Sequence, residues 1–352
     1  MGIPSGPLWF NHQFQDRESY LSTQNLINVA VIGVGAFGRS HARVYHQLAE
    51  QGEAVRLVGV VDADLARADA VAREFHCRPF GSIQQLITTH SEVQAASVCV
   101  PTSQHFAISR TLMEGGIDVL IEKPVAARLT EADELVSLTY RLGRLAQVGH
   151  LERFNPAIRA TAPLLTHPMF FEVHRLSVFT PRSLDIDVVL DLMIHDLDVV
   201  LSFVRSPIKE IRAVGLPILS GKTDIANVRM EFDSGCIANF TASRVSTERV
   251  RKVRFFQPQQ YISVDYTRQD VLVFSVVDGE DGEPTINPQI KVAKPAVVAE
   301  EPLHAELKSF LECVRTRSKP VVPLEDGRRA LAAALDITAA ISDHNQKINL
   351  NF

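Results

Sequence analysis

Residues 28–48 read NVAVIGVGAFGRSHARVYHQL, and this stretch decides the fold of the first half of the chain. Its first residues form a short apolar run that predicts a strand, and a helix-forming run follows Gly38. Gly33, Gly35 and Gly38 stand between the two in GxGxxG spacing. The first glycine permits a tight turn, the second a close approach to a pyrophosphate, and the third close packing of the helix on the strand. Because a helix amino end supplies free N–H groups for phosphate, the stretch predicts a dinucleotide site.

An acidic residue ends the next predicted strand, VRLVGVVDAD over 55–64. Asp62 at this place can accept hydrogen bonds from the adenosine ribose hydroxyls and would repel a 2′-phosphate. NAD is therefore favoured over NADP as the cofactor, although Arg67 stands close enough in the sequence to keep NADP open. The alternative is that Asp62 only caps the helix expected over 63–75.

Strands and helices alternate up to about residue 150. Further strands are predicted within 95–105, 117–124 and 144–150, with helical patterns around 82–88, 104–114 and 130–142. This alternation predicts a doubly wound parallel sheet, a Rossmann domain over 28–150, in which ligands gather at the carboxyl ends of the strands. Polar residues follow three of these ends, at 101–105, 122–124 and 149–153.

The strand over 117–121 ends in Glu122, Lys123 and Pro124. Charges at such a place are either a solvated rim held by a salt bridge or part of a working site. The strand-end position favours the working site.

The pattern changes after residue 151. Strand-like runs with alternating polarity follow one another over 169–179, 209–219, 224–245, 251–266 and 270–277. They predict an α+β domain over 151–352 with a large, open, mainly antiparallel sheet and helices on one face. Closing helices over 304–314 and 324–344 are able to pack back on the Rossmann domain, and residues 1–27 form an extension that we expect to be loose.

A helix expected over 188–204 carries Asp191, His195 and Asp198 within an apolar sequence. Asp191 and His195 are four residues apart and share a face, so the carboxylate can orient the imidazole. Three polar groups on one face are costly unless they face a cleft. The alternatives are a satisfied core histidine, or a metal pair, but no further His or Cys cluster completes a ligand set and no metal is expected.

Composition limits the classes of partner. The 352 residues carry a net charge of −5 and a pI of about 6.2, so no general basic field attracts nucleic acid. Four cysteines without a CxxC motif favour a reducing cytoplasm. No apolar run reaches membrane-spanning length, and residues 1–27 lack the pattern of a secretory signal.

Five motifs in order resemble the glucose-fructose oxidoreductase/inositol dehydrogenase (Gfo/Idh/MocA) family. They are VIGVGAFGRSHA (31–42), VPTSQH (100–105), IEKP (121–124), GHLERFNP (149–156) and DLMIHDLD (191–198). The resemblance implies hydride transfer between a nicotinamide and a sugar or cyclitol carbon, with Lys123, Asp191 and His195 as the catalytic set. One departure is Met193, which stands where the family often has glycine and predicts a bulkier pocket floor.

The resemblance and the glycine motif together give the expected cofactor-binding residues: Gly33, Gly35, Ala36, Phe37, Gly38, Asp62, Pro101, Thr102, His105, Glu122 and Lys123. A general base must lie within hydrogen-bond reach of the reacting hydroxyl, and either Lys123 or His195 can take that role.

Two stretches, 148–158 and 190–203, resemble members of the family that oxidise the C3 hydroxyl of UDP-N-acetylglucosamine for an aminotransferase on the way to diamino-sugar lipid A. A sugar diphosphate requires cations, for which Arg153, Arg175 and Arg182 are candidates, unless they are only solvated arginines. The expected substrate-binding residues are Lys123, Arg153, Asn155, Arg175, Arg182, Asp191 and His195. An inositol, hexose or nucleotide-linked uronate dehydrogenase, or a non-catalytic nucleotide-sensing Rossmann protein, remain alternatives. A homodimer or homotetramer is expected, because open sheets of this kind often pair face to face.

Overall fold

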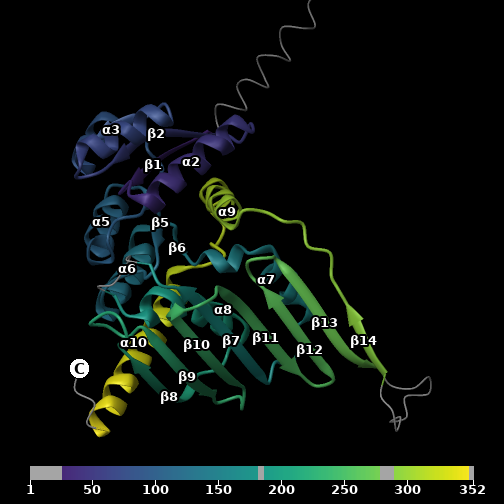
Figure 1. Ribbon diagram of the computed structural model, residues 1–352. Helices are drawn as coiled ribbons and strands as arrows, with labels where there is room; N and C mark the ends of the chain where they lie inside the picture. The colour runs from purple at the N-terminus through teal and green to yellow at the C-terminus, as the bar shows by residue number, and fades with distance from the viewer. Residues whose placement is uncertain (1–25, 181–185, 278–288, 349–352) are drawn as a thin grey trace, which may run out of the picture. The chain divides into compact units, whose positions relative to one another are not determined.

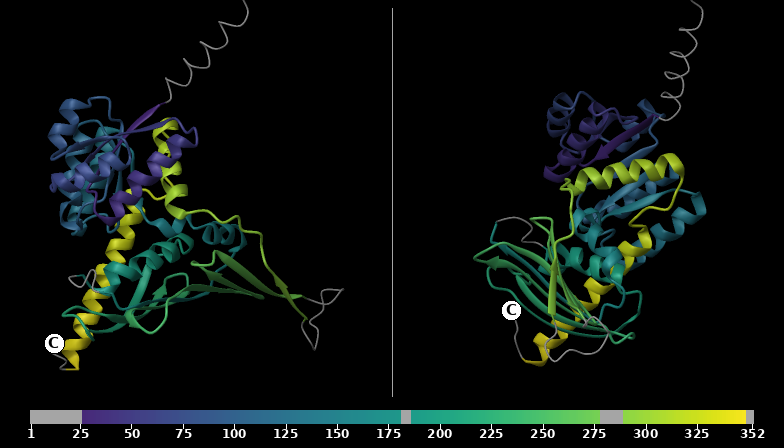
Figure 2. Two further views of the ribbon diagram at one scale, coloured as in Figure 1. Left: turned by 45° about the horizontal axis from the view of Figure 1, so that its top comes forward. Right: turned by 90° about the vertical axis from the view of Figure 1, so that its right-hand side faces the viewer.

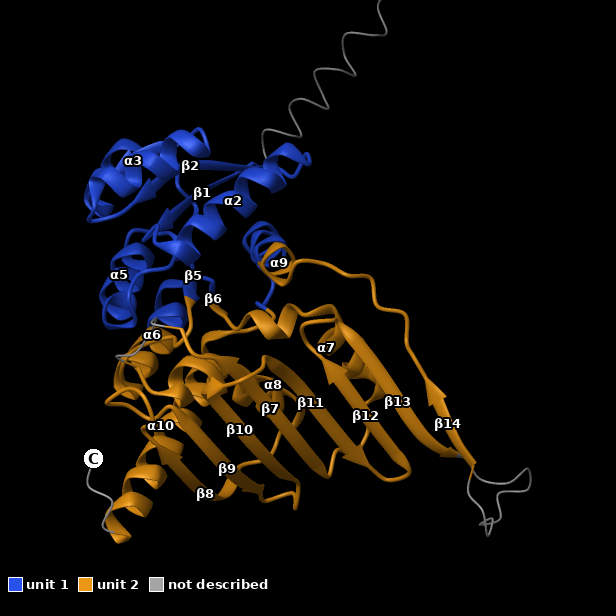
Figure 3. Ribbon diagram, in the orientation of Figure 1, with its two compact units in different colours: residues 1–121, 138–146, 307–320 blue, residues 122–137, 147–306, 321–352 orange. Residues whose placement is uncertain are grey.

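The computed structural model describes residues 26–180, 186–277 and 289–348, so the expected extension over 1–27 lies almost wholly outside the described residues. Two compact units divide the chain (Figure 3). Unit 1 comprises Met1–Ile121, Leu138–Ala146 and Leu307–Pro320, and unit 2 comprises Glu122–Ser137, Gln147–Glu306 and Val321–Phe352.

A six-stranded sheet carries the first half of the chain, in the order β3-β2-β1-β4-β5-β6 (Figure 1). Its strands are β1 (Ile27–Ile32), β2 (Val55–Val61), β3 (Arg78–Phe80), β4 (Ala95–Val98), β5 (Asp118–Glu122) and β6 (Ala146–Gly149). β1 lies parallel to β2 and β4, and β4 parallel to β5. The register aligns Ile32 with Val98 and Val98 with Ile121, so the residues that follow these strands leave the sheet at one edge.

The helices between these strands follow the predicted patterns closely. They are α2 (Ala36–Glu50), α3 (Leu65–Glu74), α4 (Ile83–Thr89), α5 (Thr102–Glu114) and α6 (Leu129–Leu142). Ser82 begins α4, where its Oγ accepts a hydrogen bond from the Gln85 N–H. This is the usual role of serine at a helix start, and it explains why the predicted and observed starts agree.

An eight-stranded sheet forms most of unit 2, in the order β14-β13-β12-β11-β7-β10-β9-β8. Its strands are β7 (Phe170–Val178), β8 (Ile208–Leu216), β9 (Ile225–Phe232), β10 (Ile237–Ser246), β11 (Val250–Gln257), β12 (Gln260–Asp265), β13 (Asp270–Val277) and β14 (Gln289–Ala293). β7 and β10 pair in parallel, and the other neighbouring pairs are antiparallel. The predicted fold class, a Rossmann domain followed by an α+β domain with a mainly antiparallel sheet, is confirmed.

Helices pack on one face of this sheet (Figure 2). The helical segments outside the Rossmann pattern are η1 (Leu151–Phe154), α7 (Pro156–Thr161), η2 (Ala162–Leu164), η3 (Val189–Met193), α8 (Ile194–Phe203), α9 (Pro302–Thr316) and α10 (Leu324–Lys347). Alternate strand residues such as Phe171, Val173 and Phe255 join Leu197 and Ile337 in one buried core. The other face of the sheet carries the intervening, more polar residues.

The helix expected over 188–204 is divided in the structure. A turn of π-helix over Val189–Met193 precedes the regular helix α8. Asp187 begins the turn, because its Oδ1 accepts hydrogen bonds from the Val189 and Leu190 N–H groups at 2.9 Å each. Wide turns of this kind are frequent at functional sites.

Candidate active site

The glycine loop after β1 has the geometry that its spacing predicts. Gly33 has a φ of +83°, a conformation that L side chains rarely adopt. A Cβ at position 38 would lie 1.8 Å from the Gly33 oxygen, so only glycine lets α2 pack against this loop. A Cβ at position 35 would meet nothing within 4 Å, and Gly35 caps α2 without a side-chain hydrogen bond. The loop therefore leaves a helix amino end open to an anion.

Asp62, at the end of β2, holds the glycine loop. Its Oδ2 accepts a hydrogen bond from the Val34 N–H and its Oδ1 one from the Asp64 N–H, both at 2.9 Å. Asp64, not Asp62, caps α3, because the Asp64 carboxylate accepts from the Arg67 N–H. The alternative interpretation of Asp62 as a helix cap is thus wrong. Arg67 Nη1 lies 3.4 Å from the Asp62 carboxylate, close enough to neutralise part of its charge.

A cavity of about 600 Å³ in unit 1 contains several of the predicted cofactor residues. The lining includes the predicted Gly33, Gly35, Asp62 and Pro101, together with Arg67, Ser82, Gln84 and Gln104, which were not in the expected set. Ser82 and Gln84 follow β3, a strand of three residues that the apolar pattern did not reveal. These residues fit a dinucleotide, since the glycines open the loop and the acid and amides offer hydrogen bonds.

The other predicted cofactor residues of unit 1 lie at the starts of α2 and α5 or inside the loop after β4. Ala36 is the first residue of α2, and Phe37 is 42% exposed beside it. Thr102 begins α5 after Pro101. His105 is buried with its Nε2 2.8 Å from the Val100 oxygen, so it holds the loop after β4 from inside.

Lys123 follows β5 and belongs to unit 2, within which it contacts the π turn. Its Nζ donates a hydrogen bond to the Asp191 backbone oxygen at 2.7 Å and lies 3.6 Å from Asp191 Oδ1. The Lys123 side chain is 19% exposed. Burial lowers the pKa of Lys123 below its ordinary value, although the nearby Asp191 and Glu122 oppose this change. An amine with a lowered pKa is available as a proton acceptor nearer neutral pH.

His195 lies at the start of α8, near Lys123. Burial, followed by the positive charges of Lys123 and Arg175, lowers the pKa of His195 well below its ordinary value, so the ring is neutral. Within the described residues, its buried Nδ1 has no hydrogen-bond partner. The Asp191 carboxylate faces Lys123 instead, because Asp191 sits inside the π turn rather than in the regular helix assumed from the spacing.

His150 is a polar residue of this region that the predicted site omitted. It follows β6, is 1% exposed, and lies near Lys123, since that charge contributes to its lowered pKa. Glu122 packs against the same strand end, because a Cβ at Gly149 would lie 2.5 Å from Glu122 Oε1. The strand-end position of His150 was the available signal.

Two residues expected to bind substrate have structural roles. Arg175 is 3% exposed and is fixed by Asp196 and Glu152, at 2.6 and 3.0 Å. Asn155 is buried, caps α7 and donates to the Tyr266 oxygen. Both side chains are occupied within the core, which argues against the expected substrate contacts.

The other residues expected at the substrate site are ion-paired, buried or outside the described residues. Arg153 is held by Asp198 and Asp326, at 3.5 and 3.3 Å. Arg182 lies outside the described residues. Asp198 is 2% exposed, so it does not face a cleft as the helical pattern suggested. Met193 is 1% exposed, so it does not form the bulky pocket floor that the departure from the family motif suggested.

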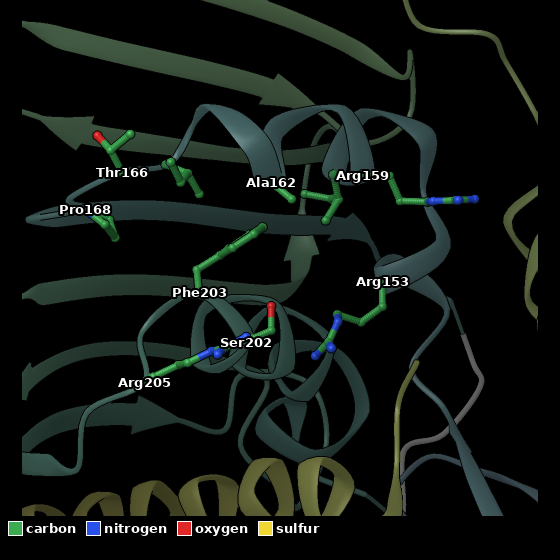
Figure 4. A pocket seen from close by; sticks show the side chains of 10 residues that line it. Arg153, Arg159, Ala162, Thr166, Pro168, Ser202, Phe203 and Arg205 are labelled. Atoms are coloured by element: carbon green, nitrogen blue, oxygen red, sulfur yellow. The ribbon is translucent and has the colours of Figure 1, made fainter. Parts of the chain in front are cut away.

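A second cavity, of about 390 Å³, lies beside α7 and the end of α8 in unit 2. Arg153 and Arg205 extend toward Ser202 from opposite sides, whereas Arg159 points away (Figure 4). Arg205 and Arg159 are exposed, as solvated arginines usually are.

Comparison with known proteins gives consistent matches. The oxidoreductase family with an NAD-binding Rossmann fold, GFO/IDH/MocA, matches residues 27–150, and the C-terminal domain of that family matches residues 169–263. The UDP-N-acetylglucosamine 3-dehydrogenase of Acidithiobacillus ferrooxidans is 36% identical over 91% of this chain and 99% of its own. A scyllo-inositol 2-dehydrogenase (NAD(+)) of Bacillus subtilis is 25% identical over 85% of this chain and 89% of its own.

Comparison with solved structures also finds proteins of the same fold. The Acidithiobacillus enzyme superposes with a TM-score of 0.81, at 35% identity over 90% of this chain and 98% of that one. An oxidoreductase domain protein from Kribbella flavida, at 16% identity, has a TM-score of 0.80 over 91% of this chain and 98% of that one, and shows the fold alone.

The open glycine loop and the acid after β2 fit a dinucleotide, and the matched family model describes an oxidoreductase with an NAD-binding Rossmann fold. The chain belongs to the Gfo/Idh/MocA oxidoreductase family. The predicted resemblance, enzyme class and NAD cofactor are thereby confirmed. Across the described ranges, no helix combines the length and apolarity needed to cross a membrane.

Proposed function

We propose that the protein oxidises the C3 hydroxyl of UDP-N-acetylglucosamine to a ketone, with NAD as hydride acceptor. The full-length match to an enzyme of that activity supports this choice, and the match to an inositol dehydrogenase is weaker in identity. We further propose a NAD-binding domain over 28–150 and a substrate-binding domain over 151–352.

The observation that carries the proposal is the setting of Lys123. Its amine is fixed on the Asp191 oxygen at 2.7 Å, while burial lowers its pKa. We assign Lys123 as the acceptor of the hydroxyl proton, because burial and nearby cations lower the pKa of His195 and make its imidazole a weak base, which can still hydrogen bond the substrate oxygen. Asp191 positions the amine.

The bound NAD supplies the hydride acceptor. We propose that the glycine loop over Gly33–Gly38 and Asp62 hold its adenosine half, with Pro101 and Thr102 along it and Glu122 near its nicotinamide ribose. The O–H proton passes to Lys123 Nζ as the C–H bond breaks, and the amine must then lose that proton before another turnover.

The diphosphate contact is assigned to Arg153, with Arg182 as a second candidate. Arg153 is the described arginine of the expected set that is not enclosed in the core, with a side chain 15% exposed.

A panel of alcohols tests the substrate. Purified protein with NAD is expected to form NADH with UDP-N-acetylglucosamine and much less with N-acetylglucosamine, myo-inositol, glucose or UDP-glucuronate. Reduction of the product by borodeuteride, followed by NMR, is expected to place deuterium at C3. Preference for a free cyclitol or a uronate would replace the substrate, and bound NAD(H) without turnover of any alcohol would favour a nucleotide-sensing role.

We propose that two copies pair through the open face of the eight-stranded sheet. Rings of Phe170, Phe256, Tyr261 and Phe274 form a continuous row across four strands, with centroids 5.3, 4.9 and 5.1 Å apart. These side chains are partly exposed on the face opposite the core, where an aromatic row is typical of an interface.

Mass photometry tests this pairing. Wild-type protein is expected as a dimer or tetramer, and Tyr261→Glu should shift it to smaller species because it buries a charge in the row. Tyr140→Glu, at an exposed tyrosine of α6, is the matched control and should leave the assembly unchanged. A monomeric wild type, or an unchanged Tyr261→Glu assembly, would contradict this interface.

We also propose that the protein acts in the cytoplasm, supported by its four cysteines without a CxxC motif, and that an aminotransferase uses the keto sugar on the way to a diamino-sugar lipid A. Conversion of the 3-keto product by a coupled aminotransferase, with loss of the ketone signal, tests that order.

A further inference from the structure

A group of buried polar side chains in unit 2 includes His150, which lies near Lys123, and has no part in the chemistry above. Gln147, His150, Asp198 and Glu306 are each at most 2% exposed. In the described part of the chain, Gln147 Oε1, both His150 ring nitrogens, Asp198 Oδ2 and both Glu306 carboxylate oxygens have no hydrogen-bond partner. Buried polar atoms are rarely left unpaired, because each costs desolvation free energy. Ordered water is the usual partner in such a place.

These side chains come from neighbouring elements of unit 2. Gln147 Nε2 lies 3.5 Å from the Glu306 backbone oxygen, which links β6 to the first turn of α9. The Glu122 carboxylate packs against Gly149, the last residue of β6, which precedes His150. The strand end thus brings His150, Glu122 and Glu306 into one region.

The charges of these residues affect one another's pKa values. Burial, then Arg153 and Lys123, lowers the pKa of His150 to about 3. Burial, then the charges of Glu122 and Asp198, raises the pKa of Glu306 well above its ordinary value. Lys123 and Glu122 thus lie close enough to His150 to affect its pKa, and Glu122 and Asp198 close enough to Glu306.

We call the series His150, Glu122, Glu306 and Asp198 the polar row, and it approaches solvent beyond Asp198. Burial raises the pKa of Asp198 to about 7, against the effect of Arg153. Asp198 Oδ1 lies 3.5 Å from Arg153 Nη1, and Arg153 Nη2 lies 3.3 Å from Asp326, whose side chain is 27% exposed. The charged and titratable groups that act on the row are Glu122, Lys123, Arg153, His195, Asp326 and Arg329.

We propose that His150, Glu306 and Asp198, with Glu122 and bound water, carry the proton of each turnover from Lys123 to the surface near Asp326. This inference rests on the proposed alcohol oxidation. In that reaction the alcohol and NAD⁺ give a ketone, NADH and one H⁺: the C–H bond breaks as hydride leaves, and the O–H proton moves to Lys123 Nζ. The amine must pass that proton on, and a row of buried acids and water is a route for it.

Glu306→Gln keeps the shape of the side chain and removes the carboxyl proton. We expect kcat for the alcohol that the wild type oxidises to fall on the order of 10-fold or more, with a larger solvent deuterium isotope effect and an altered pH profile. Added formate should restore part of the rate, and NAD affinity should be unchanged. Glu312→Gln, on the exposed face of the same helix, is the matched control and should behave as wild type. If Glu306→Gln melts well below wild type, His150→Gln repeats the test from the other end of the row.

A second readout requires no turnover. Infrared difference spectra of wild-type protein at neutral pH should contain the carbonyl band of a protonated carboxylic acid, which Glu306→Gln removes and Lys123→Met shifts. Unchanged kcat, isotope effect and pH profile in Glu306→Gln, or a band that ignores both substitutions, would overturn the proposal. A wild type that oxidises no alcohol rejects the proposed function, while the infrared result still decides separately whether Glu306 and Lys123 share a proton network.

Discussion

Lys123→Ala is expected to lower kcat by about 10²–10⁴-fold, the range that a lost general base removes. The amine that receives the hydroxyl proton is absent in this variant, and neutral His195 is held at low basicity by burial and by neighbouring cations. Steady-state NADH formation measures the loss. Lys209→Ala, at an exposed lysine paired with Glu231, is the matched control and should retain wild-type rate.

The pH profile identifies the role of the amine. Lys123 must be unprotonated to accept a proton, so the wild-type rate should rise with pH and level off above the lowered pKa of Lys123. Lys123→Arg should be nearly as inactive as Lys123→Ala, because a guanidinium does not deprotonate in this range. Circular dichroism should be unchanged, since the Lys123 side chain is 19% exposed and lies outside the buried core. A Lys123→Ala variant with near-normal rate and an unchanged pH profile would transfer the base to His195.

The Rossmann half was predictable because its requirements are local. Gly33 needs a positive φ and Gly38 must lack a Cβ, and both demands follow from a turn of six residues. The strands are apolar runs buried on both faces, which makes their existence visible in the sequence. β3, with three residues, is too short to leave such a signal, and Ser82 and Gln84 beside it were missed for that reason.

The strands of the second half could be predicted from the sequence, whereas the arrangement of its polar residues could be predicted less well. Alternating polarity revealed most strands of the open sheet, but the polar residues at its centre depend on tertiary packing. The spacing of Asp191 and His195 assumed a regular helix, whereas the π turn directs Asp191 to Lys123, a residue distant in sequence. Arg175 reads as a strand-edge cation in the sequence, although it lies on the buried face of β7.

Arg175→Met is expected to lower the free energy of unfolding by about 3–5 kcal/mol, as when one partner of a buried ion pair is removed. Asp196 accepts hydrogen bonds from this guanidinium at 2.6 and 2.9 Å and Glu152 one at 3.0 Å, so the substitution leaves two buried acids without their cation. Thermal and urea unfolding measure the loss. Arg212→Met, at an exposed arginine 2.7 Å from Glu210, is the matched control and should change stability by no more than about 1 kcal/mol.

The same variant has a defined pH dependence. Burial raises the pKa of Asp196 above its ordinary value, and Arg175 opposes that rise. A carboxyl whose pKa is raised by folding contributes stability below its unfolded pKa and loses that contribution as pH rises through the folded pKa. Since Arg175→Met raises the folded pKa of Asp196 further, the stability deficit against wild type should widen as the pH rises above the ordinary range of an aspartate. A stable Arg175→Met protein with a raised KM for the UDP-sugar alone would instead return this arginine to the diphosphate site.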